Sequence, residues 1–449
     1  MFSPRLRLVT VGAVALIFVA AFENLAVTTV MPVISAELDG ASLYAVAFAG
    51  PLAVSVLGMV VAGMWADRSG PRVPLYASVA LFVIGLLVAG TATAMGAVVA
   101  GRLVHGLGGG ALTVSLYVVV GRIYPAALQP KIFGMFGAAW VVPALVGPFV
   151  AGVLGQTVGW RWVFLGVAVL TVGAAALVVP AMRSAAGVGT DAGDRPSWSV
   201  PRILWSLLLA AAVLVLSVAT ELEGAAVYLL GGVAFVAALV ALRPLLPRRA
   251  LRAGRGLPSV VLMRMLLAGG YFSAEIYLPY FLTDARGLSP ALAGLALTVA
   301  GVAWGLSSVL QGQVADRLAA GTSLRIGSAA VCLAIGAVVG TAVFGLPTWV
   351  AIAGWAVSGF GMGMCYPRLS VLVLGYSEPG NQGFNSAALN IADATGPAMA
   401  LSVAGALFQT TGAFAAVFAL ALAVALGALA VSGRTGARQA EPAGASLAP

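Results

Sequence analysis

Long apolar runs separated by short polar segments occupy almost the whole chain. A run of about 20 apolar residues can cross the hydrocarbon core of a bilayer as an α-helix, so each run predicts one span. The first block contains six runs, at 9–34, 44–65, 73–93, 96–121, 131–155 and 161–182. Two runs follow at 203–220 and 225–242, and a second block of six lies at 259–283, 289–312, 324–344, 347–373, 382–408 and 411–432. The pattern predicts an all-α polytopic membrane protein with 14 transmembrane helices.

The polar segments divide these helices into parts. We expect an N-terminal six-helix bundle over 9–182 and a C-terminal six-helix bundle over 259–432. Between them, 183–258 contains two cytoplasmic linkers and an inserted two-span hairpin, which we expect at the periphery of the bundles. The last segment, 433–449, is expected to be a disordered cytoplasmic tail.

Composition and charge narrow the setting. Hydrophobic residues make up 61% of the chain and charged residues 8%, with a mean hydropathy of +1.06, which excludes a soluble globular protein. The net charge of +9 is not gathered on a solvated basic face, so nucleic acid is not an expected partner. Cys332 and Cys365 lie in apolar runs and His105 is the single histidine, so neither a metal site nor a cofactor is expected.

The basic residues predict the orientation, because Lys and Arg accumulate in cytoplasmic loops. With the N-terminus inside, 18 of the 23 Lys and Arg residues fall in cytoplasmic segments, Arg161 and Arg286 fall on the other side of the membrane, and the remaining three, Arg102, Arg264 and Arg368, lie within or at the edges of spans. Both termini are then cytoplasmic, and a 12-span chain lacking the middle pair would have the same parity. Arginine almost replaces lysine, and Ala, Gly and Val are abundant, which is typical of GC-rich bacterial genomes. The expected location is therefore a bacterial cytoplasmic (inner) membrane.

An internal repeat relates the two blocks. The sequence GMWADR at 63–68 recurs as GQVADR at 312–317, and each copy directly follows the second run of its block. Repeated halves are typical of secondary transporters, in which the substrate site lies between the halves near the bilayer midplane and the halves rock about it. The second copy, with Asp316 and Arg317, lacks the Gly and Arg that follow the first.

The segment GMWADRSGPR resembles the loop signature G-x-L-x-D-R-x-G-R-[KR] of the major facilitator superfamily, matched at Gly63, Asp67, Arg68, Gly70 and Arg72. Nearly the whole chain resembles this family, which implies its fold of two six-helix bundles. Asp67 is suited to face the N-terminus of a neighbouring helix, and Arg68 and Arg72 to pair with carboxylates or carbonyls. We expect this loop to gate the transport path.

Three further stretches resemble family signatures. GRLVHGLGGGA is similar to the fourth-span pattern R-x-x-x-G-x-G, which begins at Arg102. PALVGPFVAG is similar to the fifth-span exporter pattern, aligned at Pro143, Gly147, Pro148 and Gly152. ENLAVTTVMP resembles the first-span signature of the 14-span drug:proton antiporters, with Glu23 where an Asp usually stands. The resemblance implies proton-coupled export, and Gly-Pro in the fifth span indicates a bent or tightly packed helix.

Four ionisable residues interrupt apolar runs, and we expect them to couple protons to substrate: Glu23, Arg102, Glu275 and Asp393. A charged side chain at the bilayer centre costs at least about 2.5–3.5 kcal/mol unless it is paired or solvated, so such residues are functional candidates. Counting about 1.5 Å per residue, Glu23 lies roughly 20 Å into its run, too deep to reach bulk water without a cavity. His105 shares a helix face with Arg102, and we expect a backbone carbonyl to satisfy it.

The acids of the second block have alternative explanations. Glu275 follows Tyr271 on one helix face, and it either takes part in transport or forms a structural ion pair with Arg264 or Arg368.

Asp393 follows Asn390 on one face and precedes Gly396 and Pro397. It either takes part in transport or satisfies backbone groups of a helix opened at the Gly-Pro pair. Four aromatic residues either shape an apolar pocket or only pack: Trp140, Tyr277, Trp304 and Trp355.

The leading functional prediction is proton-coupled efflux of lipophilic, cationic drugs or metabolites by alternating access, with the small molecule, protons and the bilayer as partners. The alternative is proton-coupled import of a small nutrient or anionic metabolite, in which Arg102 holds the anion. An enzyme or receptor is not expected, because the sequence has no constellation of nucleophile, base and metal and no soluble ligand-binding domain. The oligomeric state has no signature in the sequence.

Overall fold

The computed structural model describes residues 4–40, 43–184, 198–219, 225–288, 290–315, 317–378 and 380–436, and the regular elements in these ranges are helical. The N-terminal half contains α1 (Pro4–Glu37), α2 (Tyr44–Ser69), α3 (Arg72–Gly90), α4 (Met95–Ile123), α5 (Gln129–Ala138), α6 (Val141–Thr157) and α7 (Arg161–Ser184). The insertion contains α8 (Val200–Ala219) and α9 (Ala225–Leu245). The C-terminal half contains α10 (Leu257–Tyr280), α11 (Pro290–Val314), α12 (Ala320–Phe344), α13 (Thr348–Gly375), α14 (Gln382–Thr411) and α15 (Phe414–Ser432).

Within the described ranges, 12 helices are long and apolar enough to cross a membrane. Two of the 14 spans expected from the hydrophobic pattern are not among these 12 helices. The run at 203–220 belongs to α8, whose apolar part, Val200–Leu216, is shorter than a full span. The run at 131–155 forms two short helices, α5 and α6, instead of one.

The break in the fifth expected span has a local cause. Pro143 has no backbone N–H, so the carbonyl of Ala139 lacks its usual i+4 donor, and the helix is interrupted there between α5 and α6. The pair Gly147 and Pro148, expected to mark a bent or a tightly packed helix, lies within the uninterrupted α6. The interruption is therefore about two turns before Gly147, and the Gly-Pro pair does not break the helix.

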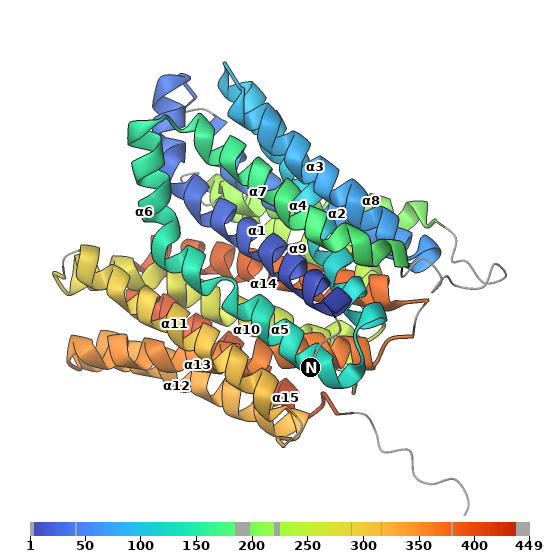
Figure 1. Ribbon diagram of the computed structural model, residues 1–449. Helices are drawn as coiled ribbons and strands as arrows, with labels where there is room; N and C mark the ends of the chain where they lie inside the picture. The colour runs from blue at the N-terminus through green and yellow to red at the C-terminus, as the bar shows by residue number, and fades with distance from the viewer. Residues whose placement is uncertain are drawn as a thin grey trace, which may run out of the picture.

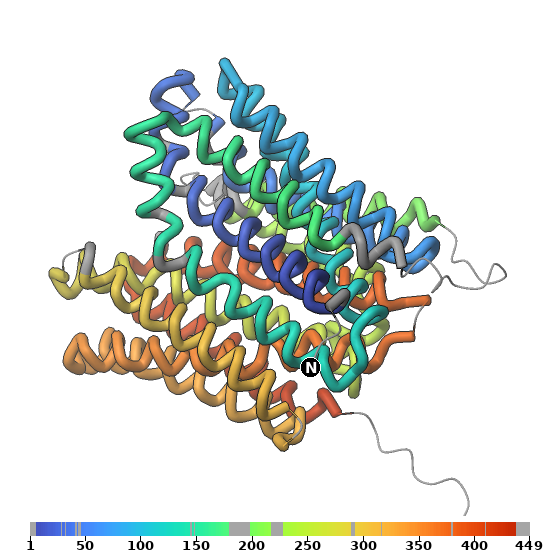
Figure 2. Tube along the Cα trace, in the orientation of Figure 1, coloured from blue at the N-terminus to red at the C-terminus, as the bar shows by residue number. Residues whose placement is uncertain are grey.

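The helices form two groups that correspond to the two halves (Figure 1). In the first, α4 packs on α2 and α3; in the second, α13 packs on α11 and α12, as the internal repeat requires. Two seams join the halves, one between α2 and α14 and the other between α5 and α11. The groups lie close together at the end that carries the 63–72 loop, which we call the motif end, and diverge toward the opposite end (Figure 2).

The inserted hairpin lies against the first seam. α8 and α9 pack on each other, α8 packs on both α2 and α14, and α9 packs on α14. The hairpin is thus outside the two groups of helices but in contact with both. Its turn, which includes Glu221 and Glu223, lies outside the described residues.

The two basic residues expected on the far side of the membrane have local partners. Arg161 Nη1 lies 2.9 Å from Glu37 Oε1, and Trp160 Nε1 donates to Glu37 Oε2 at 2.9 Å. These contacts, that of Arg161 above all, lower the pKa of Glu37 below its usual value. Arg286 donates to the carbonyl of Thr341. Each cation is therefore held at the end opposite the motif end by groups of its own half.

Both seams use glycine to bring backbones together. A Cβ atom on Gly383 of α14 would lie 2.1 Å from the carbonyl oxygen of Gly63 in α2, and a Cβ on Gly63 would lie 2.6 Å from that of Gly383. At the second seam, a Cβ on Gly312 would lie 3.0 Å from the carbonyl oxygen of Pro130. No side chain fits between α2 and α14 at this crossing.

We expect Gly383→Ala to push α14 away from α2 and to lower the stability of the protein by roughly 1–3 kcal/mol, the usual cost of overpacking. Thermal unfolding in detergent micelles measures the effect. Gly375→Ala is the matched control, since a Cβ there meets nothing within 4 Å. Equal unfolding temperatures for the two variants would contradict the close contact of the backbones.

Candidate functional site

A buried carboxylate contacts two basic side chains in the N-terminal half. Glu23 of α1 lies opposite Arg102 and His105 of α4, with 2.9 Å between Arg102 Nη1 and Glu23 Oε1 and 3.3 Å between His105 Nε2 and Glu23 Oε2. Glu23 is 2% exposed, and Arg102 and His105 are 7% exposed. The structure therefore brings together two of the four ionisable residues expected to act in coupling.

Arg102 also connects this cluster to α2, because its Nε donates to the carbonyl of Ala47 at 2.6 Å. Glycines of α4 allow the close approach that this requires. A Cβ on Gly106 would lie 2.4 Å from the carbonyl oxygen of Pro51 in α2. The glycine-rich stretch of α4 is thus a packing surface, and it positions Arg102 between α1 and α2.

The surroundings of His105 differ from the expectation. Neither ring nitrogen makes a hydrogen bond with another described residue, so the expected backbone carbonyl partner is wrong. The ring instead lies beside Glu23 and against Phe82, with 4.3 Å between the ring centroids. His105 is therefore a second ionisable group on Glu23. Its spacing of three residues from Arg102 was the signal in the sequence.

The exporter-like helix packs beside this cluster. A Cβ on Gly147 of α6 would lie 3.7 Å from side-chain atoms of Phe22 and Leu25, the residues that flank Glu23 by one and two positions in α1. One turn further, a Cβ on Gly152 would lie 3.8 Å from Thr29. The small residues of α6 therefore define the surface on which α1 rests.

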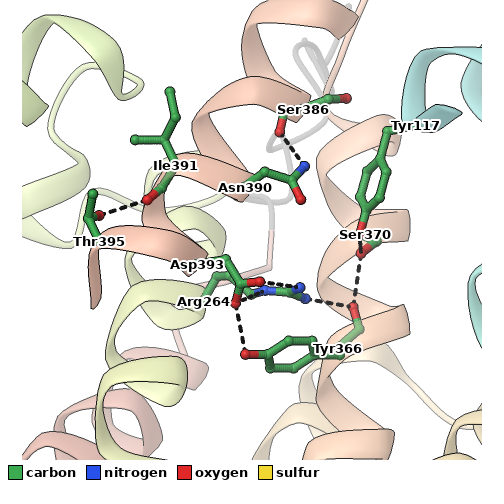
Figure 3. A network of polar contacts seen from close by, with 9 residues as sticks. All are labelled: Tyr117, Arg264, Tyr366, Ser370, Ser386, Asn390, Ile391, Asp393 and Thr395. Carbon is green, nitrogen blue, oxygen red and sulfur yellow. Dashed lines mark hydrogen bonds and ion pairs between the residues drawn. The ribbon is translucent and has the colours of Figure 1, made fainter. Parts of the chain in front are cut away.

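A second ion pair lies in the C-terminal half (Figure 3). Arg264 of α10 donates to Asp393 of α14 through Nε at 2.8 Å and Nη2 at 3.1 Å, and the Tyr366 hydroxyl of α13 donates to Asp393 Oδ1 at 2.8 Å. The alternative in which Arg264 pairs with Glu275 is therefore wrong. Arg264 pairs with Asp393 instead, because α10, which carries Arg264, packs along α14.

The helix around Asp393 is not opened. α14 continues through Gly396 and Pro397, and a Cβ on Gly396 would lie 2.2 Å from the carbonyl oxygen of Met265 in α10. Asn390 donates to the carbonyl of Ser386 at 2.8 Å, within its own helix (Figure 3). The Gly-Pro pair thus serves helix packing, and the alternative in which Asp393 satisfies an unwound backbone is wrong.

The network around Asp393 also reaches the other half. The hydroxyl of Tyr117, on α4, lies 3.2 Å from the hydroxyl of Ser370, on α13, and Ser370 donates to the carbonyl of Tyr366 at 3.1 Å (Figure 3). This contact crosses between the halves, and the sequence contained no sign of it.

Glu275 lies apart from both ion pairs. It is half-buried, and Oε1 accepts a hydrogen bond from the Tyr271 hydroxyl at 2.9 Å. The Tyr271 ring stacks on Trp355 with 5.2 Å between centroids and meets Trp304 edge-on at 5.4 Å. Two of the expected pocket aromatics therefore pack on the tyrosine that binds Glu275, whereas Tyr277 packs against Phe408.

The loop motif forms a contact across the first seam. Asp67 accepts hydrogen bonds from the backbone N–H groups of Gly383 at 2.6 Å and Phe384 at 2.9 Å, in the first turn of α14. Arg122 of α4 supports the end of α2 by donating to the carbonyl of Ala66 at 3.0 Å. Asp67 is thus placed against a helix N-terminus, where a carboxylate is favoured.

The other motif residues shape the turn after α2. Gly70 has φ +81°, a backbone conformation that favours glycine. Arg72 begins α3, with its Cζ 5.8 Å from the centroid of the Tyr76 ring, and Arg68 is half-buried at the end of α2. In the second copy of the motif, Asp316 lies outside the described residues.

We expect Arg264→Gln to destabilise the protein by up to about 3 kcal/mol, because it leaves the Asp393 carboxylate without its cation. This is the low end of the cost of breaking a buried ion pair, because the Asp393 side chain is 27% exposed. Denaturant unfolding in detergent measures it. Adding Asp393→Asn should recover part of the loss, and a double variant no more stable than Arg264→Gln would contradict the pairing.

Comparison with known proteins agrees with this architecture. The model of the Major Facilitator Superfamily matches residues 13–350. A Mycobacterium tuberculosis protein named "Probable multidrug-efflux transporter" is 29% identical over 452 residues, covering 96% of this chain and 93% of that protein. "Multidrug transporter protein MdtP" of Bacillus subtilis is 25% identical over 378 residues, covering 82% and 69%. The human organic anion transporter MFSD10 (TETRAN) has the same fold, with a TM-score of 0.71 at 15% identity over 96% of this chain and 100% of that one. The chain therefore belongs to the major facilitator superfamily, a family of membrane transporters and not of enzymes.

Proposed function

We propose that this protein exports lipophilic, cationic compounds in exchange for protons by alternating access. The observation that carries the proposal is the buried Glu23 carboxylate in contact with both Arg102 and His105. The names of the M. tuberculosis and B. subtilis relatives, both multidrug transporters, support efflux. In this proposal the motif end faces the cytoplasm of a bacterial cell, and α8 and the α5–α6 pair also cross the membrane, which gives 14 crossings.

Proton exchange at Glu23 can change how α1 is held. While Glu23 is ionised, its two oxygens attract Arg102 and His105 and tie α1 to α4. A proton bound at Glu23 removes that attraction, although Arg102 keeps its hydrogen bond to Ala47 of α2. The packing of α1 against α4 is thereby coupled to proton binding, which is the link that an antiporter needs.

Glu275 is the proposed contact for a cationic substrate. A carboxylate beside aromatic rings suits a lipophilic cation, because the negative charge and the ring faces both attract positive charge while the rings contact apolar groups. Tyr271, which donates to Glu275, and the two tryptophans that pack on Tyr271 are the proposed rings. Coupling would then reside in the N-terminal half and substrate binding in the C-terminal half.

Import of an anionic nutrient is less well supported. That alternative assigns Arg102 to the substrate, but its guanidinium already binds Glu23 through Nη1 and Ala47 through Nε. An incoming anion would have to displace Glu23.

We expect Glu23→Gln to abolish pH-gradient-driven uptake of a cationic dye into inverted membrane vesicles, and Glu23→Asp to keep part of it, because only the latter binds and releases a proton. Glu37→Gln is the matched control: it removes a carboxylate of the same helix that is outside the buried cluster. Dye uptake by Glu23→Gln at the rate of the unchanged protein would move the coupling role to Glu275 or Asp393. Uptake of an anion in intact cells, driven by protons, would favour import instead.

We expect Glu275→Gln to weaken transport of the cationic dye about tenfold or more, corresponding to the loss of about 1.4 kcal/mol of attraction. Transport of a neutral lipophilic compound should change little, since it gains nothing from the charge. Tyr271→Phe is the control that removes only the hydrogen bond to Glu275. Equal losses for cationic and neutral compounds would refute a charge-specific contact.

A further inference from the structure

The inserted hairpin brings a cation to the seam that Asp67 closes. Arg202 is in the first turn of α8, and its Cζ lies 4.5 Å from the centroid of the Phe384 ring in α14. The backbone N–H of this same Phe384 donates to Asp67 Oδ2 at 2.9 Å. A cation over an aromatic ring is attracted by the electrons of the ring face. Arg202 therefore holds the residue that forms one of the two hydrogen bonds across the seam.

The charge of Arg202 also acts on Asp67 itself. The carboxylate interacts electrostatically with both Arg122 and Arg202, in addition to the N-terminus of α14. Arg122 belongs to the same half as Asp67 and stays beside it when the halves separate. Arg202 differs, because its contact with Phe384 joins the insertion to the C-terminal half. Because α8 packs more extensively on α2 than on α14, separation of α14 from α2 removes the contact of Arg202 with Phe384.

The packing of the hairpin gives this contact a fixed position. α8 lies against α2 and α14 together, and Ser206, one turn after Arg202, is completely buried. The second seam, where Gly312 meets Pro130, repeats the close backbone contact of the first. Within the described ranges, one such insertion is present, and it packs on the α2–α14 seam.

We propose that Arg202 is a positioning residue for the gate, and that α8 acts through it to stabilise the conformation in which α2 and α14 are in contact at the motif end. Arg202 does not need to touch the substrate for this role. It sets the ratio between the two conformations of the transport cycle. The inference rests on the alternating-access part of the proposed function and is independent of which compound is carried.

The test measures that ratio directly. Spin labels are placed through Thr91→Cys and Leu346→Cys, at the ends of α3 and α12 opposite the motif end, after Cys332 and Cys365 are replaced by Ala. Pulsed electron paramagnetic resonance in lipid nanodiscs then gives the distance distribution, in which a long distance reports the form closed at the motif end. We expect Arg202→Gln to lower the ratio of the long- to the short-distance population about three- to tenfold.

Two further variants connect the effect to the contact. Phe384→Leu removes the ring but keeps the N–H that Asp67 accepts, so it should lower the ratio in the same direction. The double variant should show less than the sum of the two effects, because both remove one interaction. Asp67→Asn should also lower the ratio, since it weakens both hydrogen bonds across the seam.

Arg243→Gln is the matched control, because Arg243 is exposed in the last turn of α9 and its loss removes the same charge from the same hairpin. Its ratio should equal that of the parent. The proposal is overturned if Arg202→Gln keeps the parent ratio, if Arg243→Gln shifts it equally, or if the effects of Arg202→Gln and Phe384→Leu add in full. A single distance population for the parent in acidic and in neutral buffer would instead contradict alternating access itself.

Discussion

The arrangement of the two halves depends on the two hydrogen bonds that Asp67 accepts from the first turn of α14. They can form only because Gly63 and Gly383 let the backbones of α2 and α14 touch, with no side chain between them. The helix N-terminus supplies the positive end of a dipole, and the carboxylate supplies the opposite charge. With this crossing in place, Tyr117 of one half can reach Ser370 of the other, and the helices diverge toward the opposite end (Figure 1).

Each half contains an ion pair between its helices, Glu23 with Arg102 in the first and Asp393 with Arg264 in the second, and the two carboxylates have different surroundings. Asp393 receives two hydrogen bonds from Arg264 and one from Tyr366, so its carboxylate is well satisfied and suits a structural role. The Glu23 carboxylate is shared between Arg102 and a histidine whose ring nitrogens make no hydrogen bond among the described residues. Among the described residues, the Glu23 carboxylate thus accepts one hydrogen bond, from Arg102, whereas the Asp393 carboxylate accepts three. This contrast is the reason for assigning proton exchange to Glu23.

The sequence predicted the features that depend on local patterns. Helices begin and end within a few residues of most apolar runs, because burial in lipid requires continuous apolar helices. The placement of Asp67 against a helix N-terminus also followed from its motif. Partners far apart in the chain were not predictable, since they depend on which helices pack together: Asp393 was available to Arg264 only through the contact of α10 with α14.

Two features were missed for simpler reasons. Pro143 was taken as part of an exporter pattern, although its missing N–H is what interrupts the fifth span at Ala139. Arg202 is one of the 18 basic residues that the sequence assigns to cytoplasmic segments, and that topological explanation gives no sign of a specific contact. The structure shows it over the ring of Phe384.

The interruption between α5 and α6 has a mechanical consequence. α5 packs mainly on α11 and α13 of the opposite half, whereas α6 packs mainly on α1 of its own half. The two segments therefore have their main contacts in different halves, and the joint between them falls where one backbone hydrogen bond is already missing. A rotation of one half against the other can thus be absorbed at Ala139 and Trp140, so that α5 keeps its seam with α11 while α6 keeps its surface for the helix that carries Glu23.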